Sequence, residues 1–234
     1  MIAGLQKMTL LDFPGKVACT VFLGGCNYRC PFCHNTELFT GKVEEVMSTE
    51  AFLAFLEKRR GLLDGVCVSG GEPTLCPELE PLLKSIKALG FLVKLDTNGS
   101  RTKVLKQLVD ASVVDYVAMD VKNCPRRYAE TVGLEHMDLA AVEESLRFLI
   151  AGNTPYELRT TLVKQLHDGQ AVQEMGQWLA GLVPGKQPRQ LFLQSFVDRD
   201  TVVFSGLCAP EENEVLSFAD ILTPFIEKVT IRNL

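Results

Sequence analysis

The sequence lacks any run of residues that could cross a membrane. Its longest stretch without a charged side chain, residues 17–28, has twelve residues, whereas a spanning helix needs roughly 20 apolar ones. It also lacks a surplus of positive charge, because 24 Lys and Arg stand against 29 Asp and Glu, for a formal net charge of -5. These two shortages argue against a membrane partner and against non-specific binding to nucleic acid.

The first residues, MIAGLQKMTLLDFPGK, lack both a clean apolar core and a small-residue cleavage site. We therefore expect no signal peptide and a cytoplasmic location. Low-complexity sequence is missing too, since 47% apolar and 23% charged residues in 234 are the proportions of a globular chain with a buried core. No shift in composition divides the chain, so we expect a single domain over residues 1–234.

Short β-branched runs alternate with longer amphipathic segments. The pattern predicts six strands, at residues 17–23, 66–69, 91–95, 116–121, 157–163 and 190–196. It predicts helices at residues 49–60, 77–89, 104–109, 139–150, 172–182 and 212–226. Six βα units in sequence imply a parallel α/β sheet, as a doubly wound open sheet or as an incomplete barrel. In either arrangement ligands bind at the carboxyl ends of the strands.

Eight cysteines are the most unusual feature, because a cytoplasmic chain has little use for disulfides. Three of them, Cys26, Cys30 and Cys33, follow the first predicted strand within eight residues. A structural zinc site would need a fourth ligand from a second Cys or His pair, and the sequence has no convincing one. Three thiolates and one open position suit a [4Fe–4S] cluster. Zinc and incidental cysteines are the alternatives.

The other cysteines and the histidines are less informative. Cys19, Cys67 and Cys208 are interpreted as small core residues. His34 follows Cys33 directly and is a candidate to orient a thiolate or a cofactor. We expect His136 and His167, which lie among polar residues, to be solvated.

Three polar segments also follow predicted strands. In Gly70-Gly71-Glu72-Pro73 the glycines allow close backbone approach, which leaves backbone carbonyls and the Glu72 carboxylate free to accept from an ammonium group. Asp96-Thr97-Asn98-Gly99 taken alone fits an Asx-type turn that caps the next helix. Asp120 and Lys122 lie on the same side of a strand. An acid and a base buried at a strand end need partners.

These segments together resemble a known family. The spacing CxxxCxφC, with Phe32 as the aromatic residue, and the GGEP segment resemble the signatures of the radical S-adenosylmethionine (SAM) superfamily. Residues 95–99 and 119–122 resemble the DTNG and DxK segments of glycyl-radical-enzyme activating enzymes. Residues 4–16 with 26–35 resemble the activating proteins of anaerobic ribonucleoside-triphosphate reductase. The resemblance implies an incomplete (βα)6 TIM-like barrel of the radical SAM type over residues 1–234.

The resemblance also implies the cofactors and their ligands. It implies one [4Fe–4S] cluster on Cys26, Cys30 and Cys33, SAM, and a monovalent cation as a further candidate. Lys122 would pair with the SAM carboxylate, with Arg159 near it. The implied cofactor-binding residues are Phe32, Gly70, Gly71, Glu72, Asp96, Thr97, Asn98, Asp120, Lys122 and Arg159. Related formate-lyase activases end their sixth strand in Tyr-His, where this chain has Leu193-Gln194-Ser195-Phe196, so adenosine contacts there are not implied.

The function implied is activation of a partner enzyme. An electron from the cluster would cleave SAM, and the resulting radical would remove a Cα hydrogen from a glycine of a glycyl radical enzyme, with reduced flavodoxin or ferredoxin as electron donor. The first alternative is a radical SAM enzyme that acts on a small molecule or peptide. The second is a non-catalytic iron–sulfur electron-transfer protein, which SAM cleavage would exclude.

Overall fold

The computed structural model describes residues 1–40 and 43–232. The chain divides into two compact units, Met1–Asn27 with Glu37–Ala118, and Tyr28–Thr36 with Met119–Leu234. Neither unit is continuous in sequence, because residues 28–36 belong to the second unit. These residues are part of the loop after β2 that carries Cys26, Cys30 and Cys33, called the cysteine loop below. The single domain expected over residues 1–234 stays a prediction.

In the part of the chain that the structure describes, eight strands follow one another in the sheet in chain order, so β1 and β8 form its edges and the sheet is not closed. Neighbours are parallel from β2 to β4 and from β6 to β8, whereas β1 is antiparallel to β2. This open, mostly parallel α/β arrangement confirms the predicted fold class. The strands are β1 (Ile2–Thr9), β2 (Ala18–Leu23), β3 (Gly65–Gly70), β4 (Leu92–Thr97), β5 (Tyr116–Asp120), β6 (Tyr156–Leu162), β7 (Leu191–Ser195) and β8 (Val229–Arg232).

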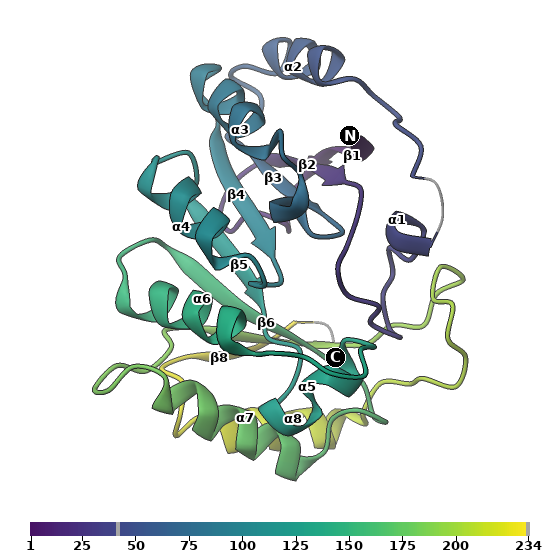
Figure 1. Cartoon of the computed structure of the whole chain (residues 1–234), viewed down its shortest axis with the longest axis vertical. Helices are drawn as coiled ribbons and strands as arrows, with labels where there is room; N and C mark the ends of the chain where they lie inside the picture. Colours follow the sequence, from purple (N-terminus) through teal and green to yellow (C-terminus); the bar gives the residue numbers. More distant parts are fainter. Residues whose placement is uncertain (41–42, 233–234) are drawn as a thin grey trace. The chain divides into compact units, whose positions relative to one another are not determined.

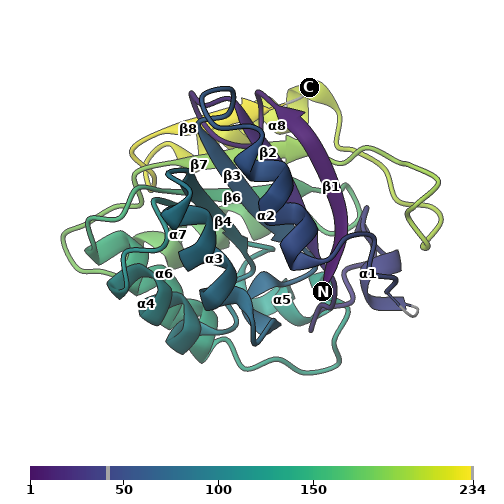
Figure 2. The ribbon, with the colours of Figure 1, turned by 90° about the horizontal axis from the view of Figure 1, so that it is seen from above.

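In the first unit, α2, α3 and α4 lie along one face of β2–β4 (Figures 1 and 2). The Ser48 side chain accepts a hydrogen bond from the Ala51 N–H and so begins α2. The apolar residues of α3 are buried, at the i, i+3, i+4 spacing of a core-facing helix. The helices of this unit are α1 (Glu37–Thr40), α2 (Thr49–Glu57), α3 (Leu79–Ala88) and α4 (Thr102–Asp110), with a 3₁₀ turn η1 (Pro73–Leu75) after β3.

In the second unit, α7 and α8 pack side by side (Figure 1). Asp168 caps α7 by accepting from the Ala171 N–H, and Glu211 and Glu214 form a capping box at the start of α8. No helix in the described part of the chain is both long enough and apolar enough to cross a membrane. The helices of this unit are α5 (Pro125–Thr131), α6 (Ala140–Ala151), α7 (Gly169–Gly181) and α8 (Glu212–Leu222).

The structure adds five elements to the prediction. The six predicted strands correspond to β2–β7, and each predicted helix is present with slightly shifted ends. The elements that were missed are β1, α1, the 3₁₀ turn η1, α5 and β8. Cys19 and Cys67 are buried as predicted, but Cys208 is exposed, so its interpretation as a core residue was wrong.

Candidate functional site

The glycine pair after β3 lies directly against the cysteine loop in the first unit. The Gly71 N–H donates to the Leu23 carbonyl (3.0 Å), and the Glu72 N–H donates to the Gly25 carbonyl (2.8 Å). A Cβ on Gly71 would lie 2.0 Å from that Gly25 oxygen and 3.1 Å from the Cβ of Cys26. Only glycine allows this approach, so the pair fixes where the loop with Cys26 leaves β2.

The segment after β4 is bound to the same loop. The Asn98 side-chain amide donates to the Asn27 side-chain oxygen (3.0 Å), and the Asn27 amide donates to the Ser100 hydroxyl (2.9 Å). The Ser100 N–H donates to Asn98 Oδ1 (3.0 Å), which is the expected Asx-type turn. The turn does not cap the next helix, as was predicted, because the N-cap of α4 is Arg101 and no side chain caps it. Asn27 is therefore a site residue that the sequence analysis missed, although it follows Cys26 directly.

The Glu72 carboxylate is buried and already bound by its own chain. Its Oε1 accepts from the Thr74 N–H (3.0 Å) and from the hydroxyls of Thr74 (2.5 Å) and Thr97 (2.8 Å). Its Oε2 accepts from the Asn98 N–H (2.6 Å). Burial raises the pKa of Glu72, and these hydrogen bonds act in the opposite direction. The sequence analysis expected this carboxylate to accept from an ammonium group; in the chain alone it accepts from these four donors, and a role in cofactor binding stays a prediction.

Asp96 pairs with a lysine that the sequence analysis did not use. The Lys94 ammonium lies 2.5 Å from Asp96 Oδ1, and the Ser69 hydroxyl donates to Oδ2 (3.0 Å). The Lys94 side chain is 0% exposed. A lysine inside the apolar run FLVKLD was the signal that could have revealed it, because a charged group inside a strand needs a buried partner.

Cys30 and Cys33 belong to the second unit, where they form a tight turn. The Cys33 N–H donates to the Cys30 carbonyl (3.2 Å), and the Asn35 N–H donates to the Cys33 sulfur (3.4 Å). Burial raises the pKa of the Cys33 thiol, while the Asn35 N–H and the Lys122 ammonium favour its thiolate. Phe32, which lies between these two cysteines in the sequence, is buried. Lys122 Nζ lies 6.0 Å from the centroid of its ring.

The cysteine loop is held from both sides within this unit. On one side the Arg29 N–H donates to the Val132 carbonyl (2.8 Å) after α5. On the other, the His34 ring stacks on Phe196 with centroids 5.8 Å apart, and its Nε2 lies 2.6 Å from the carbonyl oxygen of Val197. Phe196 directly follows β7, at the strand end that departs from the Tyr-His pattern. His34 thus connects the loop to that strand end.

Asp120, Lys122 and Arg159 form one connected cluster of charged side chains. The Lys122 ammonium lies 2.8 Å from Asp120 Oδ2, and Arg159 Nε lies 2.9 Å from Asp120 Oδ1. Lys122 is 16% exposed. Burial alone would lower the pKa of Lys122, but the negative charge of Asp120 raises it well above its usual range. The predicted same-side pair is therefore present, and β6 contributes the predicted Arg159 to it.

His167 is buried next to this charged cluster, whereas the sequence analysis expected it to be solvated. It is 3% exposed, its Nε2 lies 3.0 Å from the Lys122 carbonyl oxygen, and its Nδ1 accepts from the Val163 N–H (3.1 Å). The adjacent Asn123 is buried too, and its amide donates to the Leu166 carbonyl (2.8 Å). His136 is exposed, as predicted. His167 and Asn123 therefore hold the backbone that presents Lys122.

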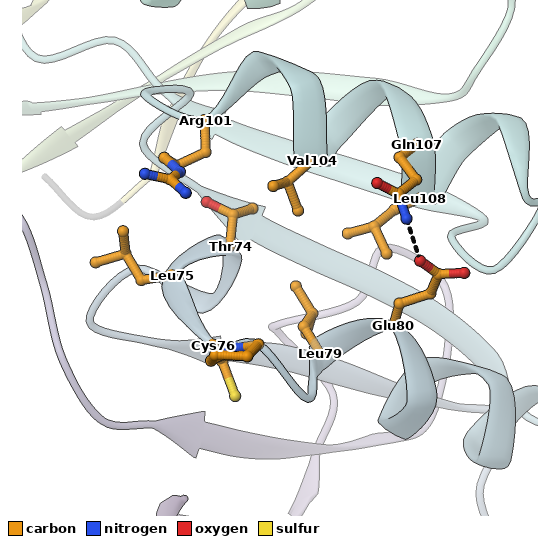
Figure 3. Close-up of a pocket in the computed structure, with 10 residues that line it drawn as sticks. Thr74, Leu75, Cys76, Leu79, Glu80, Arg101, Val104, Gln107 and Leu108 are labelled. Atoms are coloured by element: carbon orange, nitrogen blue, oxygen red, sulfur yellow. Dashed lines mark hydrogen bonds between the residues drawn. The ribbon is translucent and has the colours of Figure 1, made fainter.

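A pocket of about 270 Å³ opens beside the motif residues of the first unit (Figure 3). Apolar side chains of α3 and α4 line its floor, Arg101 and Thr74 lie at one end, and a hydrogen bond from Gln107 to Glu80 closes the other. The Thr74 that lines it also binds Glu72. None of the predicted site residues is among those that line this pocket in the described chain.

The three cysteine side chains of this loop, Cys26, Cys30 and Cys33, are of the type that binds an iron–sulfur cluster. No group of three or more His, Cys, Asp or Glu side chains in residues 1–40 and 43–232 is arranged to hold a metal ion. That geometry does not test a cluster, because a [4Fe–4S] cluster takes each thiolate on a different iron. The N–H bond to Cys33 and the nearby Lys122 ammonium are the kind of neighbours that stabilise thiolate ligands.

Comparison with known proteins shows where this chain belongs. The model of the radical SAM superfamily matches residues 20–172. A protein of Methanocaldococcus jannaschii, named as a candidate glycyl-radical enzyme activating enzyme, is 29% identical over 246 residues, which cover 100% of this chain and 96% of that protein. The pyruvate formate-lyase-activating enzyme of Clostridium pasteurianum is 32% identical over 127 residues, 52% of each chain.

Solved structures share the fold at lower identity. A domain of the pyruvate-formate lyase-activating enzyme from Bacteroides vulgatus superposes with a TM-score of 0.58 at 22% identity, over 72% of this chain and 98% of that one. The enzyme anSMEcpe with bound AdoMet has a TM-score of 0.62 at 17% identity, over 89% of this chain and 61% of that one. At these identities the likeness shows the fold alone.

Proposed function

Since this chain belongs to the radical SAM superfamily, we propose that it is an enzyme that generates a glycyl radical on a partner protein. The observation that carries the proposal is the M. jannaschii relative named for this activity, which matches over the whole of this chain and nearly all of its own length. A likeness that extends over both chains supports a shared activity better than one limited to the cysteine loop.

The cofactors of this enzyme are a [4Fe–4S] cluster and SAM, those of its superfamily. When bound, they supply the electron and the cleavable bond from which a hydrogen-abstracting radical is made. Cys26, Cys30 and Cys33 hold the cluster in this proposal. Phe32, which lies between Cys30 and Cys33 in the sequence, is buried, and in this proposal it helps to exclude water from the cluster.

The remaining predicted residues would bind and orient SAM. Gly70 and Gly71 expose backbone groups beside Cys26, since no side chain intervenes. The Lys122 ammonium neutralises the SAM carboxylate, with Arg159 beside it. Asp120 holds both cations in place through its two carboxylate oxygens. Asp96, Thr97 and Asn98 form a second polar edge at the end of β4, where a monovalent cation is a further candidate ligand.

The glycine substrate suits a protein partner, because glycine has no side chain to block approach. The first partner to test is an anaerobic ribonucleoside-triphosphate reductase, because residues 4–16 and 26–35 resemble the activating proteins of that enzyme. Reduced flavodoxin or ferredoxin is the proposed electron donor.

The test combines reduced, reconstituted protein, SAM and the partner under anaerobic conditions. We expect partner-dependent SAM cleavage and an electron paramagnetic resonance doublet from a glycyl Cα radical. A partner with that glycine replaced by alanine should give neither. The same doublet on the alanine variant would contradict the proposal.

Fast turnover of a small molecule without any partner would favour the alternative function, a radical SAM enzyme that acts on a small molecule or peptide. One curated relative does bear such a name: a protein of Thermococcus kodakarensis named as a candidate GTP 3′,8-cyclase is 31% identical over 149 residues, 62% of this chain and 47% of that protein. GTP is therefore the small molecule to include in the same assay.

A further inference from the structure

The Glu72 carboxylate is buried, and three of its four donors bind Oε1 while one binds Oε2. An ionised carboxylate offers about four lone-pair positions. Two backbone N–H groups and two hydroxyls of the chain donate to it, at 2.5–3.0 Å. The side chain is 1% exposed, and Thr74, Thr97 and Asn98 are buried with it.

The two backbone donors cannot turn away to make room for a ligand. A hydroxyl can rotate to another acceptor, but the N–H groups of Thr74 and Asn98 point where the backbone directs them. An ammonium group that displaced either of them would leave a buried N–H without an acceptor, which carries the full desolvation penalty of that group. Oε2 accepts only the Asn98 N–H, but the side chain is 1% exposed, so a direct contact between Glu72 and a ligand would require this buried arrangement to open.

The same bonds connect three segments that the sequence separates. Glu72 and Thr74 follow β3, whereas Thr97 and Asn98 end β4. The Glu72 N–H also donates to Gly25 (2.8 Å), and the Asn98 side chain donates to Asn27 (3.0 Å). Gly25 and Asn27 flank Cys26 in the sequence. One carboxylate thus fixes the ends of two strands to the loop with the first cysteine.

We infer that Glu72 is a positioning residue, which holds the glycine pair, the Asp96–Gly99 segment and the start of the cysteine loop in one arrangement and does not itself contact the SAM ammonium group. The identity of the ligand rests on the proposed function. The arrangement itself exists in the chain alone and can be measured there.

The first measurement is amide hydrogen exchange on the full chain without SAM, in Glu72→Gln. Glutamine presents an NH₂ group to donors at one of the two oxygen positions, so at least one buried bond is lost. We expect exchange at Thr74 or Asn98 to become at least tenfold faster, which corresponds to about 1.4 kcal/mol, while amides of the second unit are unchanged. Unchanged exchange at both amides would overturn the inference.

The second measurement compares SAM with an analogue that lacks the α-amino group, using reconstituted protein of equal iron content. A positioning role predicts that Glu72→Gln weakens both ligands by the same factor, because the whole surface shifts. A direct contact predicts a loss for SAM and none for the analogue, and that result would overturn the inference. If neither ligand binds the wild type, the proposed function fails, whereas the exchange result still stands or falls by itself.

Two further variants keep the test usable if Glu72→Gln folds poorly. Thr74→Val keeps the side-chain shape and removes one hydroxyl donor, so it should raise Asn98 exchange less than Glu72→Gln does, while Thr74→Ser should restore the wild-type rate. Glu57→Gln alters an exposed glutamate of the same unit, paired with Arg60, and should change nothing. Faster amide exchange at Thr74 or Asn98 in Glu57→Gln would count against the inference. So would equal exchange rates at the Asn98 amide in Thr74→Val and in the wild type.

Discussion

In the first unit one buried carboxylate, Glu72, accepts from backbone and hydroxyl groups, whereas in the second unit Asp120 binds two flexible cations, Lys122 and Arg159. Backbone donors have fixed directions, so the first arrangement is rigid before any ligand binds. The ammonium and guanidinium groups of the second can change partners when an anion arrives, because rotamer changes cost less than backbone shifts. The comparison indicates that the polar cluster around Glu72 in the first unit is rigid, whereas the charged cluster around Asp120 in the second unit is adjustable.

The largest effect is expected at the cysteines. Cys26→Ala, Cys30→Ala and Cys33→Ala should each abolish the cluster, so iron after anaerobic reconstitution should fall from about four per chain to near zero. Iron analysis and the visible absorption spectrum measure this. The exposed Cys208 provides the control, because Cys208→Ala should keep its iron. Zinc in place of iron in the wild type would refute the cluster.

The rigid arrangement can be broken at Gly71. In Gly71→Ala the methyl group would lie 2.0 Å from the Gly25 oxygen, and overpacking of this kind costs roughly 1–3 kcal/mol. For a chain of this size that lowers Tm by roughly 2–12 °C. Gly181→Ala is the matched control, because no atom lies within 4 Å of its added Cβ and alanine favours a helix. Equal Tm values for the two variants would contradict the close approach.

The adjustable charge can be tested at Lys122. A charge-assisted contact contributes roughly 1.5–3 kcal/mol, so Lys122→Ala should weaken SAM binding by about one to two orders of magnitude without loss of iron. Equilibrium binding to reconstituted protein measures it. Arg126→Ala, which removes an exposed cation paired with Glu174, should bind SAM normally. Full SAM affinity in Lys122→Ala would remove that residue from the site.

The smallest effect is a pH dependence from His167. Burial lowers the pKa of this imidazole below its ordinary value. The unfolded chain therefore takes up the proton first, so the stabilisation is complete above about pH 6.5 and is lost as the pH falls through the folded-state pKa. Urea unfolding between pH 5 and 8 should show a slope that His167→Gln reduces. An unchanged slope in His167→Gln would contradict this account.

The sequence was sufficient to predict the parallel strands and the motif residues at their ends, because each strand is an apolar run that a turn signal stops. It was not sufficient for β1, whose middle residues are half exposed at a sheet edge and do not alternate. Nor was it sufficient for α5, where Pro125 and two arginines interrupt any apolar period. A helix of seven residues shows too little of its 3.6-residue repeat to be recognised.

The site was predicted by residue type, but its contacts were not. Sequence patterns identify Glu72 and Asp120 as polar residues at strand ends, yet each also meets a donor 25 or more positions away, Asn98 for Glu72 and Arg159 for Asp120. His167 was interpreted as solvated because its sequence neighbours are polar. Its ring is buried and meets the Lys122 carbonyl, 45 positions away, which the fold and not the local sequence brings to it.

The contact between His34 and Val197 joins residues 163 positions apart. A ribosome that adds 5–20 residues per second needs roughly 8–30 s to cover that distance. For this interval the three cysteines of a nascent chain are already made, but the segment that holds the His34 end of their loop does not yet exist. A chain cut short before residue 196 would therefore carry every cysteine of the motif and lack the two contacts, with Phe196 and Val197, that hold His34.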